Sequence, residues 1–301
     1  MKFSITIPAY RSQFLKEAIN SVVNQTWQDW ELVIVDDCSP EDLRSVVNPF
    51  LADSRISYYR NEKNCGAINV VDNWNICLGH CTGDYIICMG DDDRLLPCCL
   101  DEYAKTIEAY PDLNVYHART AIINEEGERV DVQEERPAWE SCQEMILHQW
   151  KDRRKQFLGD FLFSRHWLLN NEGYVKFPLA YCSDWATANL AAKERGIANG
   201  QTFMFEYRST PYSISRSQNL RIAVSSCKLA HEWYLQSLPD MLPPFHDRYF
   251  TTQMTDMIYS DVKQKPLSST LFWLFHGKGL GINYTKIAEV CVRGVLASFL
   301  K

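Results

Sequence analysis

Short apolar runs alternate with amphipathic segments along the first third of the chain. The runs at 3–8, 32–35 and 85–89 are almost continuously hydrophobic, which is typical of strands buried on both faces of a parallel sheet. Between them, apolar residues recur at the spacing of one helix face, at Leu15, Ala18, Ile19 and Val22 and again at Val71, Trp74 and Leu78. This alternation predicts an α/β fold with a mostly parallel sheet flanked by helices.

The pattern changes after Pro111. Residues 115–118 and 161–164 are predicted strands, and Asn124-Glu125-Glu126-Gly127 is typical of a hairpin turn. The polar, Trp-bearing segment 138–154 is predicted to be helical and able to form a surface lid. A helix should also begin near Asp184 and end before Gly196.

These patterns divide the chain into a catalytic domain and a C-terminal region. We expect an α/β domain at 1–215, made of halves at 1–110 and 111–215, and a helical region at 216–301. The last region contains apolar stretches interleaved with Lys278, Lys286 and Arg293. It could form a helix lying in a membrane interface or could pack back onto the first domain.

Acidic residues follow two of the predicted strands. Asp36 and Asp37 end one apolar run, where open α/β sheets bind ligands, although Asp37 or Ser39 could simply cap the next helix. A second run leads to three adjacent carboxylates, Asp91, Asp92 and Asp93. Adjacent carboxylates repel one another, so a divalent cation with oxygen ligands, shared with a diphosphate, would explain them. The alternative is a solvated acidic turn.

Composition narrows the choice of ligand and partner. The 301 residues carry a net charge of −7, which gives no reason to expect nucleic acid and means that a phosphate ligand needs a local device such as a metal. Eleven cysteines, an odd number without a Cys-x-x-Cys pair, favour reduced thiols. No apolar run is long enough to span a membrane and no signal peptide is evident, so we expect a cytoplasmic protein.

Histidines and cysteines give little further indication of a metal site. His117, His148, His166 and His231 show no ligand spacing and are expected to be structural. A zinc site from Cys77, His80 and Cys81 is conceivable, but the same segment also fits amphipathic packing.

Taken in order, the motifs resemble the inverting family 2 glycosyltransferases of the GT-A fold, over about residues 1–216. The matching segments are Ile7-Pro8-Ala9-Tyr10, residues 15–26, Glu31 to Ser39, Asn64-Cys65-Gly66, Asn75, Gly83-Asp84-Tyr85, Gly90-Asp91-Asp92-Asp93, Gly173-Tyr174 and Ser183-Asp184-Trp185.

The resemblance implies a role for each matching position. Asp36 would read the nucleobase with Asp37 beside it, and Asp91 would meet the ribose. The other residues expected along the nucleotide are Pro8, Ala9, Tyr10, Asn64, Gly66 and Asn75. Asp92 would be the principal ligand of Mn²⁺ or Mg²⁺, with Asp93 as a second ligand. Asp184 would be the catalytic base, although Ser183-Asp184 could also cap a helix, and Trp185 could stack on an acceptor sugar.

Several positions depart from the family pattern. Gly90 stands where the metal element often begins with Asp. Cys38 replaces a usual Gly, which suggests that its turn needs no positive φ. Trp74 replaces a common Arg on the phosphate side, and Ser183 replaces a common Glu. Arg208 could reach a diphosphate or could be an ordinary surface arginine.

The implied function is transfer of a sugar from a nucleotide-diphosphate sugar, expected to be a UDP-sugar, to a hydroxyl of a glycan or lipid-linked acceptor. Cell-surface polysaccharide biosynthesis is the expected setting, with peripheral membrane contact through the C-terminal region. A nucleotidyltransferase is disfavoured because Pro8-Ala9-Tyr10-Arg11-Ser12 lacks a Gly-rich loop. A non-catalytic nucleotide-sugar-binding protein remains the other alternative.

Overall fold

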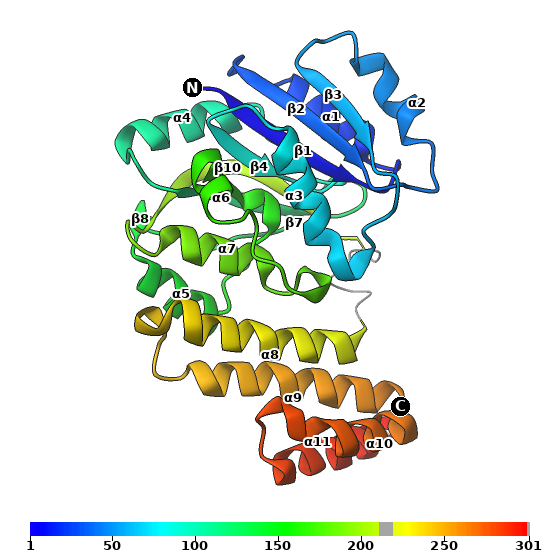
Figure 1. The fold of residues 1–301 in the computed structure, drawn as a ribbon. Coiled ribbons are helices and arrows are strands. Elements are labelled where there is room, and N and C mark those ends of the chain that lie inside the picture. Colours follow the sequence, from blue (N-terminus) through cyan, green and yellow to red (C-terminus); the bar gives the residue numbers. More distant parts are fainter. Residues whose placement is uncertain (211–218, 300–301) are drawn as a thin grey trace.

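A ten-stranded mixed sheet lies at the centre of the catalytic region, with helices on both faces (Figure 1). This computed structural model describes residues 1–210 and 219–299. The main strand order is β3-β2-β1-β4-β9-β6-β10-β5. The strands are β1 Phe3–Ala9, β2 Trp30–Asp36, β3 Ile56–Arg60, β4 Tyr85–Cys88, β5 Arg94–Leu95, β6 Val115–Ile123, β7 Arg129–Val132, β8 Trp139–Glu140, β9 Phe161–Ser164 and β10 Ile197–Arg208.

The first four strands of this order are parallel, as the apolar runs predict. β2 shows why such a run is buried on both faces. Leu32 and Ile34 enter one core, whereas Val33 and Val35 enter the other, because successive side chains of a strand point to opposite faces. The β1–β2 register runs from Phe3 opposite Trp30 to Ala9 opposite Asp36, which brings the carboxyl ends of both strands to one edge.

The remaining strands make the sheet mixed. β9 pairs antiparallel with both β4 and β6, whereas β10 runs parallel to β6 and antiparallel to β5. The strands of 1–110 and 111–215 therefore form one continuous sheet, and the expected flanked α/β fold is confirmed. β10 was not predicted, because Gly200-Gln201-Thr202 interrupts its apolar pattern. Near this interruption, its pairing with β6 contains register shifts.

Helices α1 and α4 cover one face of the sheet, and α3, α5 and α7 belong to the core on the other. The α-helices are α1 Leu15–Val23, α2 Leu43–Val47, α3 Val70–His80, α4 Cys99–Ala109, α5 Cys142–Lys151, α6 Arg165–Asn170, α7 Ser183–Ala192, α8 Leu220–Ser237, α9 His246–Gln264, α10 Pro266–His276 and α11 Tyr284–Ser298. Two of the 3₁₀ turns are η2 Ala67–Asn69 and η4 Pro178–Ala180.

The prediction that segment 138–154 forms a surface lid is wrong, although the predicted helix is present as α5. Ser141 and Glu144 form a capping box at the start of this helix. Met145, Ile146 and Trp150 are then buried in the core shared with α7 and the C-terminal helices. A helix that buries this face is anchored, because opening it would expose apolar area to water.

The C-terminal helices stack below the sheet domain (Figure 1). α8 packs on α9, and α9 packs on both α10 and α11. A buried contact ties this stack together, since the indole Nε1 of Trp273 donates to Asp261 at 2.9 Å. The boundary predicted at 215/216 falls outside the described residues. None of the helices that the structure describes has both the length and the apolar character needed to cross a membrane.

Candidate functional site

The carboxyl ends of β1, β2 and β4 are tied together by hydrogen bonds from the predicted site residues. The backbone N–H of Asp37 donates to the carbonyl of Ala9, which follows Pro8 at the end of β1. Asp91, beyond β4, accepts the backbone N–H groups of Tyr10 and Arg11 through Oδ2, each at 2.7 Å. These contacts give one rigid edge on which the Tyr10 ring is 44% exposed.

Asp36 is fully buried, and its carboxylate is occupied by partners from the protein. Oδ1 accepts the N–H of Ser39 at 2.7 Å, and Oδ2 accepts the hydroxyl of Tyr58 at 2.6 Å and the guanidinium of Arg60. Burial and the Asp36 charge raise the pKa of Tyr58 to about 12, so the phenol stays protonated as a donor. The structure thus places Asp36 where it fixes the turn after β2.

Asp37 lies in contact with the predicted loop at 64–66. Its carboxylate accepts the N–H of Cys65 at 2.9 Å, and its carbonyl accepts the side-chain amide of Asn64 at 2.6 Å. Gly66 then adopts a φ of +75°, a conformation that favours glycine. The structure therefore joins Asp37, Asn64 and Gly66.

The expectation that Cys38 needs no positive φ is wrong. Cys38 has a φ of +52°, in the left-handed region that costs an L-residue about 1–2 kcal/mol. Capture of the Ser39 N–H by Asp36 fixes the next residue, so the turn is held despite this strain.

The three acidic residues after β4 occupy different environments. Asp93 is buried, and its oxygens accept the N–H groups of Arg208 at 2.9 Å and Gly90 at 3.2 Å. Asp92 is partly exposed and lines a small cleft. Desolvation first, and then the Asp91 charge, raise the pKa of Asp92 to about 6. Asp93 therefore holds the turn, whereas Asp92 borders the cleft.

Arg208 is neither a surface residue nor open to a diphosphate. It is 1% exposed, and its guanidinium donates to the carbonyls of Asp92, Asn124 and Glu125 and to the carboxylate of Glu17. It also lies over the Phe14 ring, 4.1 Å from the centroid. Arg208 thus connects β10 to α1, to the acidic turn and to the β6–β7 hairpin.

A small cleft opens beside the acidic turn. It is lined by Arg11, Gln13, Phe14, Asp91, Asp92 and Thr210. Arg11 is the functional candidate that sequence analysis missed, although its place after Pro8-Ala9-Tyr10 was a signal for it. A larger hollow of ≈280 Å³ lies at the opposite end of β4, beside Thr82 and Arg165, away from these carboxylates.

The acidic turn has the donor set of a divalent-cation site. Mg²⁺ and Mn²⁺ favour carboxylate oxygens and often bind through one or two of them together with substrate phosphates. Asp92 supplies such an oxygen, and because burial raises the pKa of both Asp91 and Asp92, a cation bound there would stabilise their charged forms. The residues therefore fit a metal held mainly by Asp92.

Asp184 lies in the first turn of α7, after a strained loop. Leu179, Ala180 and Cys182 all have positive φ, at 61°, 51° and 62°. Such conformations are costly for residues with a Cβ, and they cluster at functional sites. The loop is held by the hydroxyl of Ser183, which accepts the N–H of Phe177 at 3.0 Å.

The Asp184 carboxylate is poised to take up a proton near neutral pH. It accepts the N–H of Trp185 at 2.9 Å, and desolvation raises its pKa to about 7. Contacts of η4 with η2 and α3 place this loop beside the segment that follows Asn64 to Gly66. Trp185 is partly exposed next to Asp184, as an acceptor contact would require.

Asn75, predicted to lie along the nucleotide, contacts the segment that contains Gly173 and Tyr174. Its side-chain oxygen accepts the N–H of Tyr174 at 2.8 Å, and a Cβ on Gly173 would come within 2.2 Å of that oxygen. Trp74 is buried edge-on against Tyr174. The two matched segments thus pack against each other. The conceivable zinc set is also separated, since Cys77 is buried in the core whereas His80 is exposed and stacked on Tyr59.

Comparisons with known proteins identify the family and the fold. The sequence model described as Glycosyl transferase family 2 matches residues 4–172. An uncharacterised glycosyltransferase of Haemophilus influenzae is 33% identical over 125 residues, which is 40% of each chain. GalNAc(5)-diNAcBac-PP-undecaprenol beta-1,3-glucosyltransferase of Campylobacter jejuni is 37% identical over 97 residues, 32% of this chain and 31% of that protein. The match therefore spans less than half of either relative.

A solved structure resembles nearly the whole chain. The S. aureus TarS 1-349 crystal structure in complex with UDP-GlcNAc superposes with a TM-score of 0.67, covering 98% of this chain and 92% of that one. The sequence identity is 16%, so this likeness concerns the fold, including the helices after the sheet domain.

Proposed function

Because the chain belongs to glycosyltransferase family 2, we propose that it transfers a sugar from a nucleotide-diphosphate sugar to a hydroxyl acceptor. The observation that carries this proposal is the presence of two carboxylates in different environments. Asp92 faces a cleft that also contains Arg11, and Asp184 sits at a helix start with a pKa raised to about 7. The first suits a departing diphosphate and the second suits proton abstraction.

The donor side would be formed by the edge where β1 and β2 end. Pro8, Ala9 and Tyr10 make one wall, and the loop at 64–66, held by Asp37, makes another. Asp91 would meet the ribose. Asp36 holds the turn after β2 and would thereby position Asp37 to contact the nucleobase. UDP is the proposed nucleotide, supported by the UDP-GlcNAc complex of the structurally similar TarS.

The phosphate side would combine a metal and a cation. Asp92 would hold Mn²⁺ or Mg²⁺, with Asp91 adjacent, whereas Asp93 would act by fixing the turn. A bound divalent ion would supply Lewis-acid stabilisation of the charge on the leaving diphosphate. Arg11, whose charge offsets part of the rise in the pKa of Asp91 and Asp92, would contribute positive charge at the same cleft.

Asp184 would act as the general base. An acceptor hydroxyl is a weak nucleophile at neutral pH, and a positioned carboxylate that removes its proton during attack contributes about 10²–10⁴-fold. The proton passes to the Asp184 carboxylate as the acceptor oxygen bonds to the anomeric carbon and the bond to the diphosphate breaks. Attack from the face opposite the leaving group inverts the anomeric centre. Trp185 would orient the acceptor sugar.

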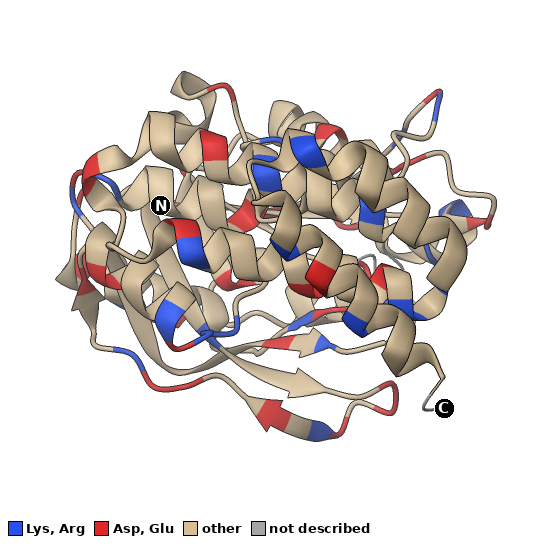
Figure 2. Ribbon diagram, turned by 90° about the horizontal axis from the view of Figure 1, so that it is seen from below, with Lys and Arg blue, Asp and Glu red and all other residues tan. Residues whose placement is uncertain are grey.

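The acceptor would be a glycan or a lipid-linked saccharide of cell-surface polysaccharide biosynthesis. The C-terminal helices support a lipid-linked acceptor, because two exposed apolar stripes lie there. Leu267, Leu271 and Phe275 line α10, and Val292 and Leu296 line α11, with Phe299 following. Residues 263–299 also hold five basic side chains and one acidic side chain, opposite in sign to the whole chain (Figure 2). An anionic lipid surface complements such a face.

A nucleotide screen followed by two variants tests the function. UDP, GDP, CDP and TDP are compared by thermal shift with Mn²⁺, since a ligand bound by the folded state raises apparent stability. UDP with metal should give the largest shift. UDP-sugars are then tested for hydrolysis and transfer to saccharide acceptors with the wild type, Asp184→Asn and Asp92→Asn.

Each variant has its own expected result. Asp184→Asn should keep the UDP–Mn²⁺ shift and lose about 10²–10⁴-fold of turnover. Asp92→Asn should lose the metal-dependent part of the shift. Nucleotide binding with no sugar release by the wild type would make the protein a binding module, and pyrophosphate release from a sugar phosphate and UTP would make it a nucleotidyltransferase. Equal shifts for all four nucleotides contradict the UDP assignment.

A further inference from the structure

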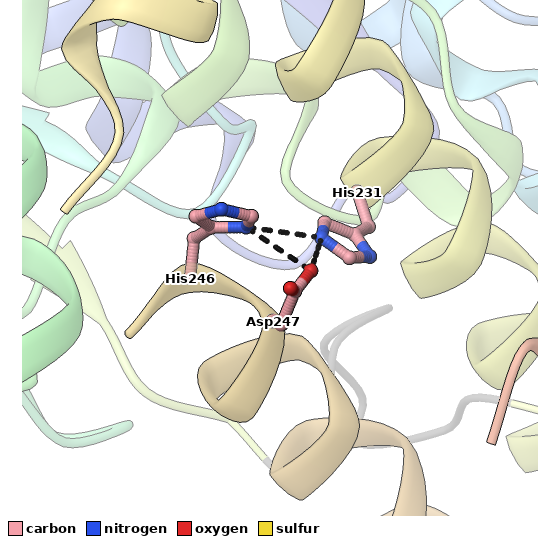
Figure 3. Close-up of side chains that lie close together, drawn as sticks. All are labelled: His231, His246 and Asp247. Carbon is pink, nitrogen blue, oxygen red and sulfur yellow. Dashed lines mark hydrogen bonds and ion pairs between the residues drawn. The ribbon is translucent and has the colours of Figure 1, made fainter. Parts of the chain in front are cut away.

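Three metal-ligating side chains meet at the junction of α8 and α9, away from the donor site. His231 comes from α8, and His246 and Asp247 come from the first turn of α9 (Figure 3). Nε2 of His231 lies 3.4 Å from Nδ1 of His246 and 3.1 Å from Oδ1 of Asp247. The third side, from Nδ1 of His246 to the same Oδ1, is 3.2 Å.

These separations have the size of one face of a metal coordination sphere. Zinc binds imidazole nitrogen and carboxylate oxygen at about 2.0–2.2 Å, so neighbouring ligands of a tetrahedral ion lie about 3.3 Å apart. The observed triangle has sides of 3.1, 3.2 and 3.4 Å. One ion can therefore contact all three atoms with only small shifts of the side chains.

We infer that His231, His246 and Asp247 form a binding site for zinc or a similar first-row divalent ion, with a fourth position left to water. Imidazole together with one carboxylate suits these ions, whereas Mg²⁺ prefers oxygen ligands alone. Asp247 is 77% exposed, so an ion can enter from solvent. The chemistry differs from that of the all-carboxylate turn at Asp92.

The packing around His231 pre-organises this site. Its ring stacks on Phe250, with centroids 4.6 Å apart and planes at 19°. Phe250 in turn packs on Trp150 of α5 and on Tyr234, whose hydroxyl accepts the side-chain N–H of Asn189 in α7. A bound ion would therefore lock the start of α9 to α8 at the place where both meet the catalytic region.

Zinc binding to the metal-stripped full chain tests the inference. Calorimetric titration with Zn²⁺ should show one saturable site that is lost in His231→Ala and His246→Ala. At a free zinc concentration about 100 times Kd, the midpoint of thermal unfolding should rise by about 5 °C in the wild type only. His148→Ala is the matched control, because His148 pairs with Asp152 and the residues that the structure describes supply no third ligand.

Cobalt distinguishes this site from the cysteines and from Asp92. Co²⁺ held by two imidazoles and a carboxylate should give tetrahedral visible bands without thiolate charge transfer, also in an Asp92→Asn background. Should His231→Ala fail to fold, Asp247→Asn serves instead, since its side chain is mostly exposed. Equal zinc stoichiometry in the wild type, His246→Ala and Asp247→Asn overturns the inference and leaves a hydrogen-bonded His–Asp group.

Discussion

At the scale of single residues, the acidic side chains separate into two groups by what surrounds them. Asp36 and Asp93 are buried, and donors from the protein fill their oxygens, so they hold turns. Asp92 and Asp184 are partly exposed and have pKa values raised to about 6 and about 7. Carboxyl groups with strongly perturbed pKa values are candidates for chemistry.

The raised pKa of Asp184 predicts the pH dependence of transfer. A general base acts in its ionised form, so kcat/KM should fall about tenfold per pH unit below pH 7 and level off above it. The profile should be measured from pH 5 to 9 at saturating Mn²⁺, because protonation of Asp92 near pH 6 would otherwise weaken metal binding. A profile that stays flat from pH 5 to 8 contradicts the assigned base.

Replacing Arg208 by Lys should destabilise the fold. The guanidinium is buried and donates in several directions, which an ammonium on a thinner side chain cannot reproduce. We expect a loss of about 3 kcal/mol or more in the free energy of unfolding in urea, because charged and backbone groups lose partners. Arg195→Lys, at a position 57% exposed, is the control and should change stability by less than about 0.5 kcal/mol. Equal losses of stability in the two variants would contradict this structural role of Arg208.

At the scale of elements, strain is concentrated in the loop that delivers Asp184. Leu179, Ala180 and Cys182, whose backbones are left-handed, belong to this loop. Contacts from outside also fix the loop backbone, for example that of Ser226, whose hydroxyl donates to the carbonyl of Pro178. α8 thus holds the loop that precedes Asp184, and the sheet domain and the C-terminal helices share one core.

Relieving this strain should raise stability. Ala180→Gly removes a Cβ from a residue with φ of +51° and should increase the free energy of unfolding by up to about 1 kcal/mol. The matched control is Ala288→Gly, in the interior of α11, which should instead lower it by about 1 kcal/mol. Both are measured by urea denaturation. A loss of stability in Ala180→Gly comparable to that of the control would contradict the inferred backbone strain at Ala180.

At the scale of the whole molecule, charge and apolar surface are unevenly distributed. The chain carries −7 overall, yet the segment 263–299 is basic and exposes the stripes on α10 and α11. Burying three large apolar side chains contributes several kcal/mol, because each is worth about 1.5–3 kcal/mol when fully buried. Such a face would hold the enzyme at a bilayer that carries its acceptor.

A vesicle-binding assay tests this orientation. The wild type should co-sediment with vesicles of phosphatidylcholine and phosphatidylglycerol, less with neutral vesicles, and less at high salt. The triple variant Leu267→Asp, Phe275→Asp, Phe299→Asp should lose at least about tenfold of the binding. Leu229→Asp, on α8 and 46% exposed, is the control and should bind normally. Identical sedimentation of both variants would remove the proposed lipid face while leaving the transferase proposal intact.

The local pattern of the chain was sufficient for the elements with a clear hydrophobic run or periodicity. Strands β1, β2 and β4 and the helices between them follow from continuous apolar runs and i, i+3, i+4 spacing, because these signals depend only on neighbours in sequence. The same runs marked the strand ends at which Asp36, Asp37 and Asp91 to Asp93 lie. The family motifs added Asp184.

Only the tertiary structure decided what each of these residues contacts. Which carboxylate stays open at the acidic turn depends on Arg208, which lies more than a hundred residues away in an unpredicted strand. Asn75 of α3 meets the loop at Gly173 and Tyr174, and His231 meets His246 because α8 and α9 are antiparallel neighbours. Such contacts depend on distances in space between segments remote in sequence, and no local periodicity records them.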